Sequence, residues 1–147
     1  VTRRLNRAQM QLVASPQFAR QHPLQHPSEL AGLPVLGAVE ADRLVHLRLL
    51  DRDGKREELA LEARLAIDDF VVRKAAALAG LGFTALPLLH CEEELARGEL
   101  VNLLPDWSMP SGFLQAVYPH RRGVLPAVRA WIDHLVASFE ECGERYV

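Results

Sequence analysis

The sequence is poor in aromatic residues and in cysteine. Phe, Trp and Tyr make up 6% of its 147 residues, so the hydrophobic core must be built mainly from aliphatic side chains. The two cysteines, Cys91 and Cys142, lie far apart and match neither a metal-ligand spacing nor a disulfide framework. We therefore expect reduced thiols in a cytoplasmic protein, with no metal and no cofactor.

Long hydrophobic runs and an excess of positive charge are also missing. No apolar run reaches the roughly 18 residues that a membrane-spanning helix needs, and the residues after Val1 lack the apolar region of a signal peptide. Seventeen basic residues against nineteen acidic ones give a formal charge of −2, whereas DNA-binding domains usually carry a basic excess. We expect no membrane partner and no DNA contact through these residues. Because the chain does not begin with Met, we expect it to be part of a longer protein.

Signatures of catalysis are missing as well. No serine stands in a G-x-S-x-G motif, and neither cysteine has the local signature of a cysteine protease. The segment Gly80–Ala85 matches G-x-G-x-x-A, but it follows a predicted helix and precedes a predicted strand, which reverses the order of a dinucleotide-binding site. We interpret it as a helix C-cap that turns tightly into a buried strand, and we expect no enzymatic activity.

Alternating strand and helix patterns predict an α/β fold. The clearest pattern is a hairpin, because Val45–Leu49 and Leu59–Ile67 alternate apolar and polar residues on either side of the Asp51–Gly54 turn. One face of this hairpin is expected to be buried. Its inward-facing side chains are expected to include Leu47, Leu61 and Leu65.

Helices are predicted on both sides of the Gly80–Ala85 turn. Ser15 can cap a short helix that begins at Pro16. A second helix opens at Asp68–Asp69, and its apolar face is formed by Val71, Ala75, Leu78 and Ala79. Two of its charged residues, Arg73 and Lys74, fall on the opposite face. The last helix begins at Pro126 and is expected to dock through Trp131, Leu135 and Val136.

One junction between a strand and a helix favours the binding of a small molecule. The strand that ends at Ile67 passes directly into the helix that starts near Asp69, so free backbone N–H groups lie at the carboxyl end of a strand. Asp68 or Asp69 is also expected to cap this helix. Because an aspartate there opposes an anion, the charge of the ligand stays open.

The order of the motifs resembles the effector-binding domain of LysR-type transcriptional regulators, over about residues 5–141. The matching segments are Leu12–Phe18, Pro27–Leu30, Ala79–Pro87, Glu94–Val101, Leu114–Pro119 and Pro126–Asp133. The resemblance implies a fold similar to type 2 periplasmic binding proteins, in which two α/β lobes are joined by crossing strands around an effector. Gln11–Ala14 and Leu114–Tyr118 would be the crossing strands.

The resemblance also implies a division of the chain. Residues 1–14 and 112–141 would be the remainder of an incomplete first lobe, residues 15–111 the second lobe, and residues 142–147 a C-terminal tail. The family's N-terminal winged helix-turn-helix is absent from the sequence, so DNA would be contacted only through that missing domain.

The effector contacts that the resemblance implies are Asp68, Asp69 and Phe70, with Ser15 as a weaker candidate. The expected function is that of a regulatory domain that senses a small molecule and self-associates as a dimer or tetramer. The alternative is a solute-binding protein of the same fold. The effector, the promoter, and the choice between activation and repression stay open.

Overall fold

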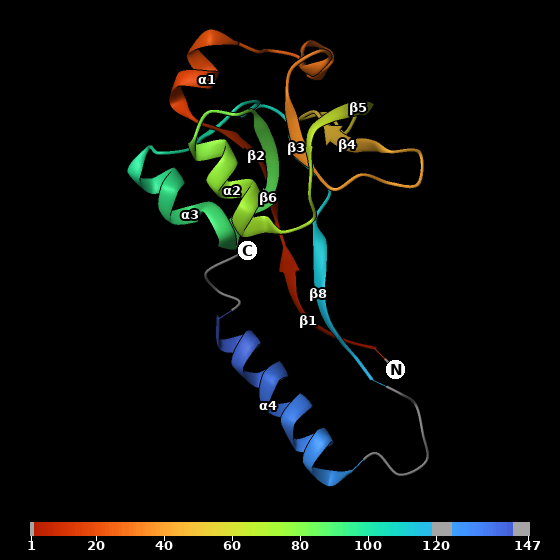
Figure 1. Ribbon diagram of the computed structural model, residues 1–147. Helices are drawn as coiled ribbons and strands as arrows, with labels where there is room; N and C mark the ends of the chain where they lie inside the picture. The colour runs from red at the N-terminus through yellow and green to blue at the C-terminus, as the bar shows by residue number, and fades with distance from the viewer. Residues whose placement is uncertain (1, 119–124, 143–147) are drawn as a thin grey trace. The chain divides into compact units, whose positions relative to one another are not determined.

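The computed structural model describes residues 2–118 and 125–142 (Figure 1). The chain divides into two compact units, one made of Val1–Gln9 with Ser111–Val147 and the other of Met10–Pro110. Of the predicted tail, residues 142–147, only Cys142 at the end of the last helix lies within the described residues.

The unit Met10–Pro110 is built on a mixed six-stranded sheet in the order β4-β5-β3-β6-β2-β7. Its strands are β2 (Met10–Ala14), β3 (Val35–Gly37), β4 (Leu44–Leu50), β5 (Arg56–Ala66), β6 (Phe83–Pro87) and β7 (Val101–Asn102). Strand β3 pairs in parallel with both β5 and β6, and the other pairs are antiparallel. The parallel strands at the centre are the part of the sheet that requires helical crossovers.

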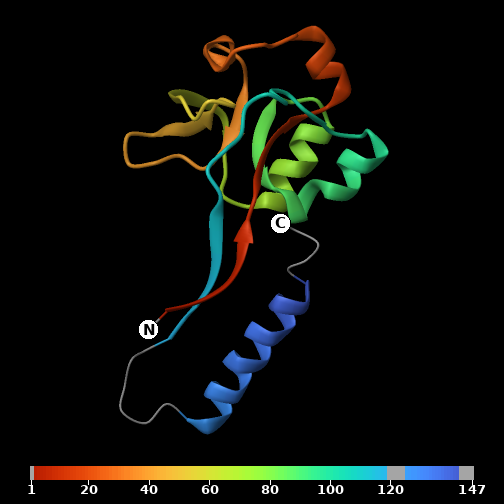
Figure 2. The same cartoon turned by 180° about the vertical axis from the view of Figure 1, so that it is seen from behind.

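Helices cover both faces of this sheet. They are α1 (Pro16–Gln21), the 3₁₀ helix η1 (Pro27–Leu30), α2 (Phe70–Leu78) and α3 (Leu88–Arg97). Phe18 of α1 and Leu30 of η1 pack with the hairpin in one hydrophobic cluster. The second cluster joins Ala76 and Ala77 of α2 to Cys91 of α3 on the other face, where α2 and α3 lie side by side (Figures 1 and 2).

The predicted hairpin is confirmed, with one change of face near its end. Strands β4 and β5 pair antiparallel, and Leu47 and Leu61 are buried as expected. Leu65 is half-buried but packs in the cluster with α2 and α3, not in the one with Leu61. The pairing of β3 with β5 shifts register between Val35 and Leu36, and such an irregularity moves later side chains to the opposite face.

The face of α2 that packs on the sheet differs from the predicted one. Val71 is 64% exposed and Leu78 is 37% exposed. The buried face instead carries Arg73, Ala76 and Ala77. Two adjacent alanines allow the helix to approach the sheet closely, so small side chains face the sheet and the larger apolar ones face solvent. Both stripes have helical spacing, which is why periodicity alone selected the wrong one.

The second unit contains a two-stranded antiparallel sheet and one long helix. Strand β1 (Thr2–Ala8) pairs with β8 (Gly112–Val117), and α4 (Pro126–Cys142) contacts β1. The strand over Thr2–Ala8 escaped prediction because its mostly polar residues show no clear alternation.

The predicted docking face of α4 is partly wrong. Ile132 is the buried residue in the part of α4 whose side chains are described, Leu135 and Val136 are half-buried, and Trp131 is 61% exposed. A two-stranded sheet offers α4 a narrow surface, so only one edge of its apolar stripe is covered.

Candidate functional site

The predicted junction between strand and helix is present where β5 runs into α2. Asp69 is the N-cap of α2, and its Oδ1 accepts hydrogen bonds from the backbone N–H groups of Val71 at 2.8 Å and Val72 at 3.0 Å. This confirms that one of the two aspartates caps the helix. The Asp69 carboxylate therefore already uses two of the donors that a ligand would otherwise find there.

Phe70, the first residue of α2, joins the starts of two helices. Its ring lies 5.2 Å from the His90 ring of α3, measured between centroids. Helix α3 follows β6 directly, and its N-cap Pro87 makes no side-chain capping hydrogen bond. Two helix N-termini thus meet beside Phe70, where backbone dipoles present partial positive charge.

Arg73 is the residue of this junction that sequence reasoning placed on the wrong face. It is 7% exposed, and its guanidinium carbon lies 4.5 Å from the centre of the Phe70 ring, a cation–π contact. Nη1 donates to the Ala85 carbonyl at 3.4 Å and Nη2 to the Asp68 carbonyl at 3.2 Å. Burial lowers the pKa of Arg73, while the nearby charges of Asp68 and Asp69 oppose that shift. Its position three residues after Phe70 was the signal that could have placed it here.

Ser15 lies elsewhere. It is 7% exposed and caps α1, because its hydroxyl oxygen accepts a hydrogen bond from Phe18 N–H at 3.2 Å. Gly80, just past the C-terminus of α2, lies beside it, since a Cβ added at Gly80 would stand 3.7 Å from Ser15 Oγ. The structure therefore brings Asp68, Asp69 and Phe70 together at one end of α2 and places Ser15 near the other end.

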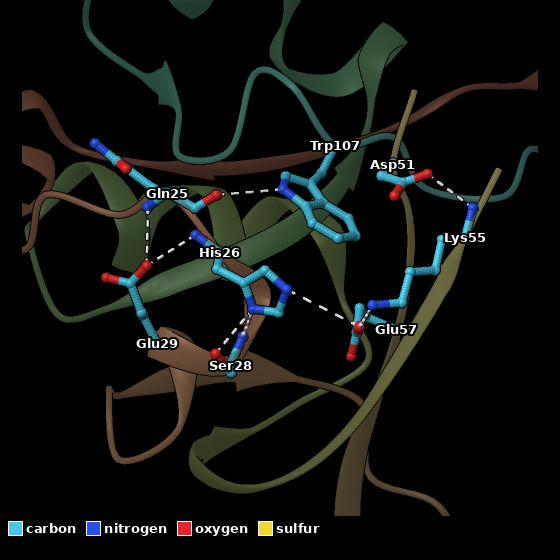
Figure 3. Close-up of polar contacts among 8 residues, drawn as sticks. All are labelled: Gln25, His26, Ser28, Glu29, Asp51, Lys55, Glu57 and Trp107. Atoms are coloured by element: carbon cyan, nitrogen blue, oxygen red, sulfur yellow. Dashed lines mark hydrogen bonds and ion pairs between the residues drawn. The ribbon is translucent and has the colours of Figure 1, made fainter. Parts of the chain in front are cut away.

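A second cluster contains the residue types of a hydrolytic triad. His26 Nδ1 lies 2.8 Å from Ser28 Oγ, and His26 Nε2 lies 3.9 Å from Glu57 Oε1 (Figure 3). The Ser28 N–H also donates to Nδ1 at 3.2 Å, while Glu29 accepts from the His26 N–H at 2.8 Å. This reciprocal pattern is a capping box for η1.

The ring of His26 also packs edge-on against Trp107 at 5.1 Å between centroids, and Trp107 donates its indole N–H to the Gln25 carbonyl at 3.3 Å (Figure 3). The 3.9 Å separation from Glu57 is too long for the hydrogen bond that orients a catalytic base. The cluster is explained by its structural contacts.

Other kinds of site find little support in the described ranges, residues 2–118 and 125–142. A hollow of about 390 Å³ lies on the hairpin, lined by the exposed side chains of Arg48, Arg56 and Glu58 together with Leu49, Leu50 and Pro110. Over the same ranges, no three His, Cys, Asp or Glu side chains are grouped to hold a metal ion. No described helix combines the length and hydrophobicity needed to cross a membrane.

The architecture defines the class of the protein. A sheet with parallel central strands, covered on both faces by helices, matches the regulatory domains whose fold resembles type 2 periplasmic binding proteins, which confirms the predicted fold class. Residues 1–140 match the family model described as the LysR substrate binding domain, and the chain belongs to this family.

Several curated relatives of the chain are named as transcriptional regulators. It is 32% identical over 120 residues to the HTH-type transcriptional regulator PtxR of Pseudomonas aeruginosa, a match covering 74% of this chain and 38% of PtxR. It is 35% identical over 103 residues to the probable HTH-type transcriptional regulator LtrA of Klebsiella pneumoniae, covering 68% of this chain and 32% of LtrA. The chain thus spans well under half the length of these two relatives.

Solved structures agree with this assignment. The regulatory domain of the C227S variant of AphB from Vibrio vulnificus superposes with a TM-score of 0.80 at 28% identity, over 93% of this chain and 70% of that one. The full-length Vibrio cholerae virulence activator AphB, a LysR-type regulator, superposes with a TM-score of 0.80 at 27% identity, over 95% of this chain and 48% of that one. The regulatory domain of CrgA from Neisseria meningitidis superposes with a TM-score of 0.75 at 25% identity, over 95% of this chain and 68% of that one.

Proposed function

We propose that this chain is the regulatory part of a LysR-type transcription factor and senses a small molecule at the start of α2. The observation that carries the site is the junction of β5 with α2, where a capped helix N-terminus, the Phe70 ring and the start of α3 come together. Helix N-termini at the carboxyl ends of strands are common ligand sites in open α/β sheets.

The division of the chain into lobes belongs to the same proposal, and it differs from the two compact units in that β2 pairs within the sheet of the larger unit. Residues 15–111 form the second lobe of the effector domain, and residues 1–14 with 112–141 contribute the crossing strands and part of the first lobe. DNA is contacted by a winged helix-turn-helix outside these residues. The protein acts in the cytoplasm and is not an enzyme.

Effector binding changes gene expression by favouring one arrangement of lobes or subunits over another. A ligand shifts such an equilibrium only as far as its affinities for the two arrangements differ. Asp69 fixes the first turn of α2 through its two hydrogen bonds, so Phe70 is presented from a defined position. Phe70 is the side chain that we expect the effector to contact.

The test uses the full-length regulator and a reporter driven by a promoter that it occupies in the cell. A metabolite panel identifies the compound that changes reporter output, and dose–response curves are then compared between variants. We expect Phe70→Ala to shift the curve to roughly tenfold higher concentration, the loss of about 1.4 kcal/mol of binding free energy. Leu81→Ala, at a 53% exposed apolar residue beyond the other end of α2, should leave the curve unchanged. An unchanged response of the Phe70 variant, with promoter occupancy intact, would place the effector elsewhere.

The alternative of a solute-binding protein finds no support among the relatives and solved structures described above, which are named as transcriptional regulators or their regulatory domains. The gene sequence upstream of Val1 separates the two classes directly. We expect it to encode a winged helix-turn-helix, whereas a signal peptide with a surface tether would favour the solute-binding protein.

A further inference from the structure

Arg73 carries a buried positive charge without a carboxylate partner. It is 7% exposed, and no described carboxylate oxygen lies within the 4.0 Å of an ion pair from its nitrogens. Its contacts are two backbone carbonyls at 3.4 and 3.2 Å and the face of Phe70. The Nε atom is buried and makes no hydrogen bond in the described part of the chain.

Burying a guanidinium with one N–H unpaired is unfavourable unless another group supplies an acceptor and an opposite charge. Removing a cation from water without a partner of opposite charge is unfavourable, and a buried N–H left without an acceptor adds to that penalty. A guanidinium presents Nε and one terminal nitrogen along a single edge, which matches the two oxygens of a carboxylate. In Arg73, Nε is unpaired and Nη2 holds one carbonyl, so this edge retains donor capacity.

The position of Arg73 makes this donor capacity relevant to a ligand. Its guanidinium lies beside the Asp68 carbonyl, immediately before the N-terminus of α2. Phe70, which covers one face of the guanidinium, also contacts His90 in the first turn of α3. Asp68 and Asp69 are exposed, so the carbonyl that Nη2 holds belongs to an accessible loop, although Nε itself is covered.

We propose that Arg73 is the anion-binding residue of this site and that its ligand carries a single carboxylate, held by the Nε–Nη2 edge beside the α2 N-terminus. This inference rests on the proposed effector site and names the chemical class of its ligand as a small organic acid. Asp68 and Asp69 lie close enough to affect Arg73 electrostatically. Their charges disfavour a dianionic group such as phosphate more strongly than a monoanionic carboxylate.

The direct test follows the Nε–H resonance of Arg73 by NMR in the 147-residue chain, with the signal assigned by its loss in Arg73→Gln. The probes are sodium acetate, acetamide, inorganic phosphate and sodium chloride at matched ionic strength. We expect a saturable shift with acetate, no saturable shift with acetamide or chloride, and weaker binding of phosphate. The absence of a saturable acetate shift, an equal shift with chloride or acetamide, or tighter binding of phosphate than of acetate would each overturn the proposal.

Variants separate binding from folding. Arg73→Gln lacks the Nε–H signal, so acetate binding by the variants is followed through the backbone amide shifts of Phe70 and Val71. Arg73→Gln should weaken acetate binding at least tenfold, whereas Arg64→Gln, at an exposed position of β5, should bind acetate as the parent chain does. Asp68→Asn should tighten acetate binding about threefold, because one opposing charge is removed. If circular dichroism shows that Arg73→Gln does not fold, the acetate titrations of the parent chain and of Asp68→Asn test the proposal instead. No tightening in Asp68→Asn counts against the proposal.

The outcome is independent of the effector test. A desensitised Phe70→Ala regulator together with no acetate binding would reject this inference and leave the proposed function in place. Saturable acetate binding at Arg73 together with an unaltered Phe70→Ala response would support the anion site and reject the effector role of the Phe70 contact.

Discussion

Gly82 and Pro34 approach so closely that no side chain fits between them. A Cβ atom on Gly82 would stand 2.2 Å from the Pro34 carbonyl oxygen. The same oxygen accepts the hydrogen bond of the Phe83 N–H at 3.0 Å, where β6 begins to pair with β3. Gly80, at a φ of +78°, turns the chain out of α2 just before this contact. The Gly80–Ala85 segment is therefore the tight helix-to-strand turn that the sequence indicated.

Gly82→Ala is expected to destabilise the protein strongly. The new methyl group would meet backbone and not a flexible side chain, so the β3–β6 pair must move apart. We expect a loss of about 3 kcal/mol or more in the free energy of unfolding, measured by chemical denaturation. Gly54→Ala is the matched control. Its φ of +83° is strained for alanine but its surroundings are open, so a loss of about 1 kcal/mol is expected. Equal losses in the two variants would contradict the steric argument.

Local sequence signals predicted the elements of the larger unit well. The Asp51–Gly54 turn predicted the hairpin, and Ser15 and Asp69 marked helix starts that the structure confirms. Each of these signals depends on a few neighbouring residues whose preferred backbone angles or capping hydrogen bonds are independent of distant contacts. The capping aspartate at the candidate site belongs to this group.

The choice of buried helix face could not be predicted in the same way. In α2, Ala76 and Ala77 face the sheet although Val71 is more hydrophobic, because the closeness of the helix to the strands decides which residues fit. In α4, Trp131 is exposed because only β1 and β8 are present to receive the helix. Arg73 was missed for the first of these reasons, since it shares the face of the two alanines.

The ion pair between Lys74 of α2 and Glu94 of α3 should make stability depend on pH. Lys74 Nζ lies 2.7 Å from Glu94 Oε1, with side-chain exposures of 27% and 14%. The hydrogen bond from Lys74 holds the pKa of Glu94 below its ordinary value. The stability that the ion pair contributes is thus fully present above the unfolded-state pKa of Glu, about 4.3. It is lost as the pH falls through the lower pKa of Glu94 in the folded chain.

Glu94→Gln tests this dependence. We expect the variant to lose about 0.5–1 kcal/mol at pH 7, and the difference from the parent chain to shrink as the pH approaches 3. Glu93→Gln, which removes an exposed carboxylate paired with Arg97 within α3, should cost less than about 0.5 kcal/mol. Urea denaturation at several pH values measures both. A difference for Glu94→Gln that stays constant with pH would rule out the ion pair as its cause.

Cys91 should be chemically inert in the folded chain. It is fully buried, its Sγ lies 3.5 Å from the Pro87 carbonyl oxygen, and burial raises the pKa of its thiol to about 11. Because the thiolate is the reactive form, we expect very slow labelling by a disulfide reagent and by hydroperoxide at pH 7. The experiment uses a Cys142→Ser background and compares native with urea-unfolded protein. Similar labelling rates in the two states would show that Cys91 is accessible.

The exposed apolar face of α2 should mediate association with a second copy of the chain. Val71, Val72 and Leu78 are 64%, 42% and 37% exposed, and Ala75 and Ala79 lie on the same side. This face carries no charged residue, since Arg73 is buried and Lys74 pairs with Glu94. An uncharged apolar stripe sets no like charges against each other when two copies meet, so the same face on two molecules can pack in a symmetric dimer.

Val71→Glu is the variant that tests this surface. A glutamate in the first turn of α2 is compatible with the helix dipole, so the fold should be retained while two negative charges oppose each other across a symmetric contact. Sedimentation velocity should show a concentration-dependent dimer for the parent chain and a shift of at least tenfold in its dissociation constant for Val71→Glu. Trp131→Glu, at an equally exposed position on α4, serves as the control and should leave the dimer intact. A parent chain that stays monomeric at high concentration would contradict the prediction, and loss of the dimer only in Trp131→Glu would move the contact to α4.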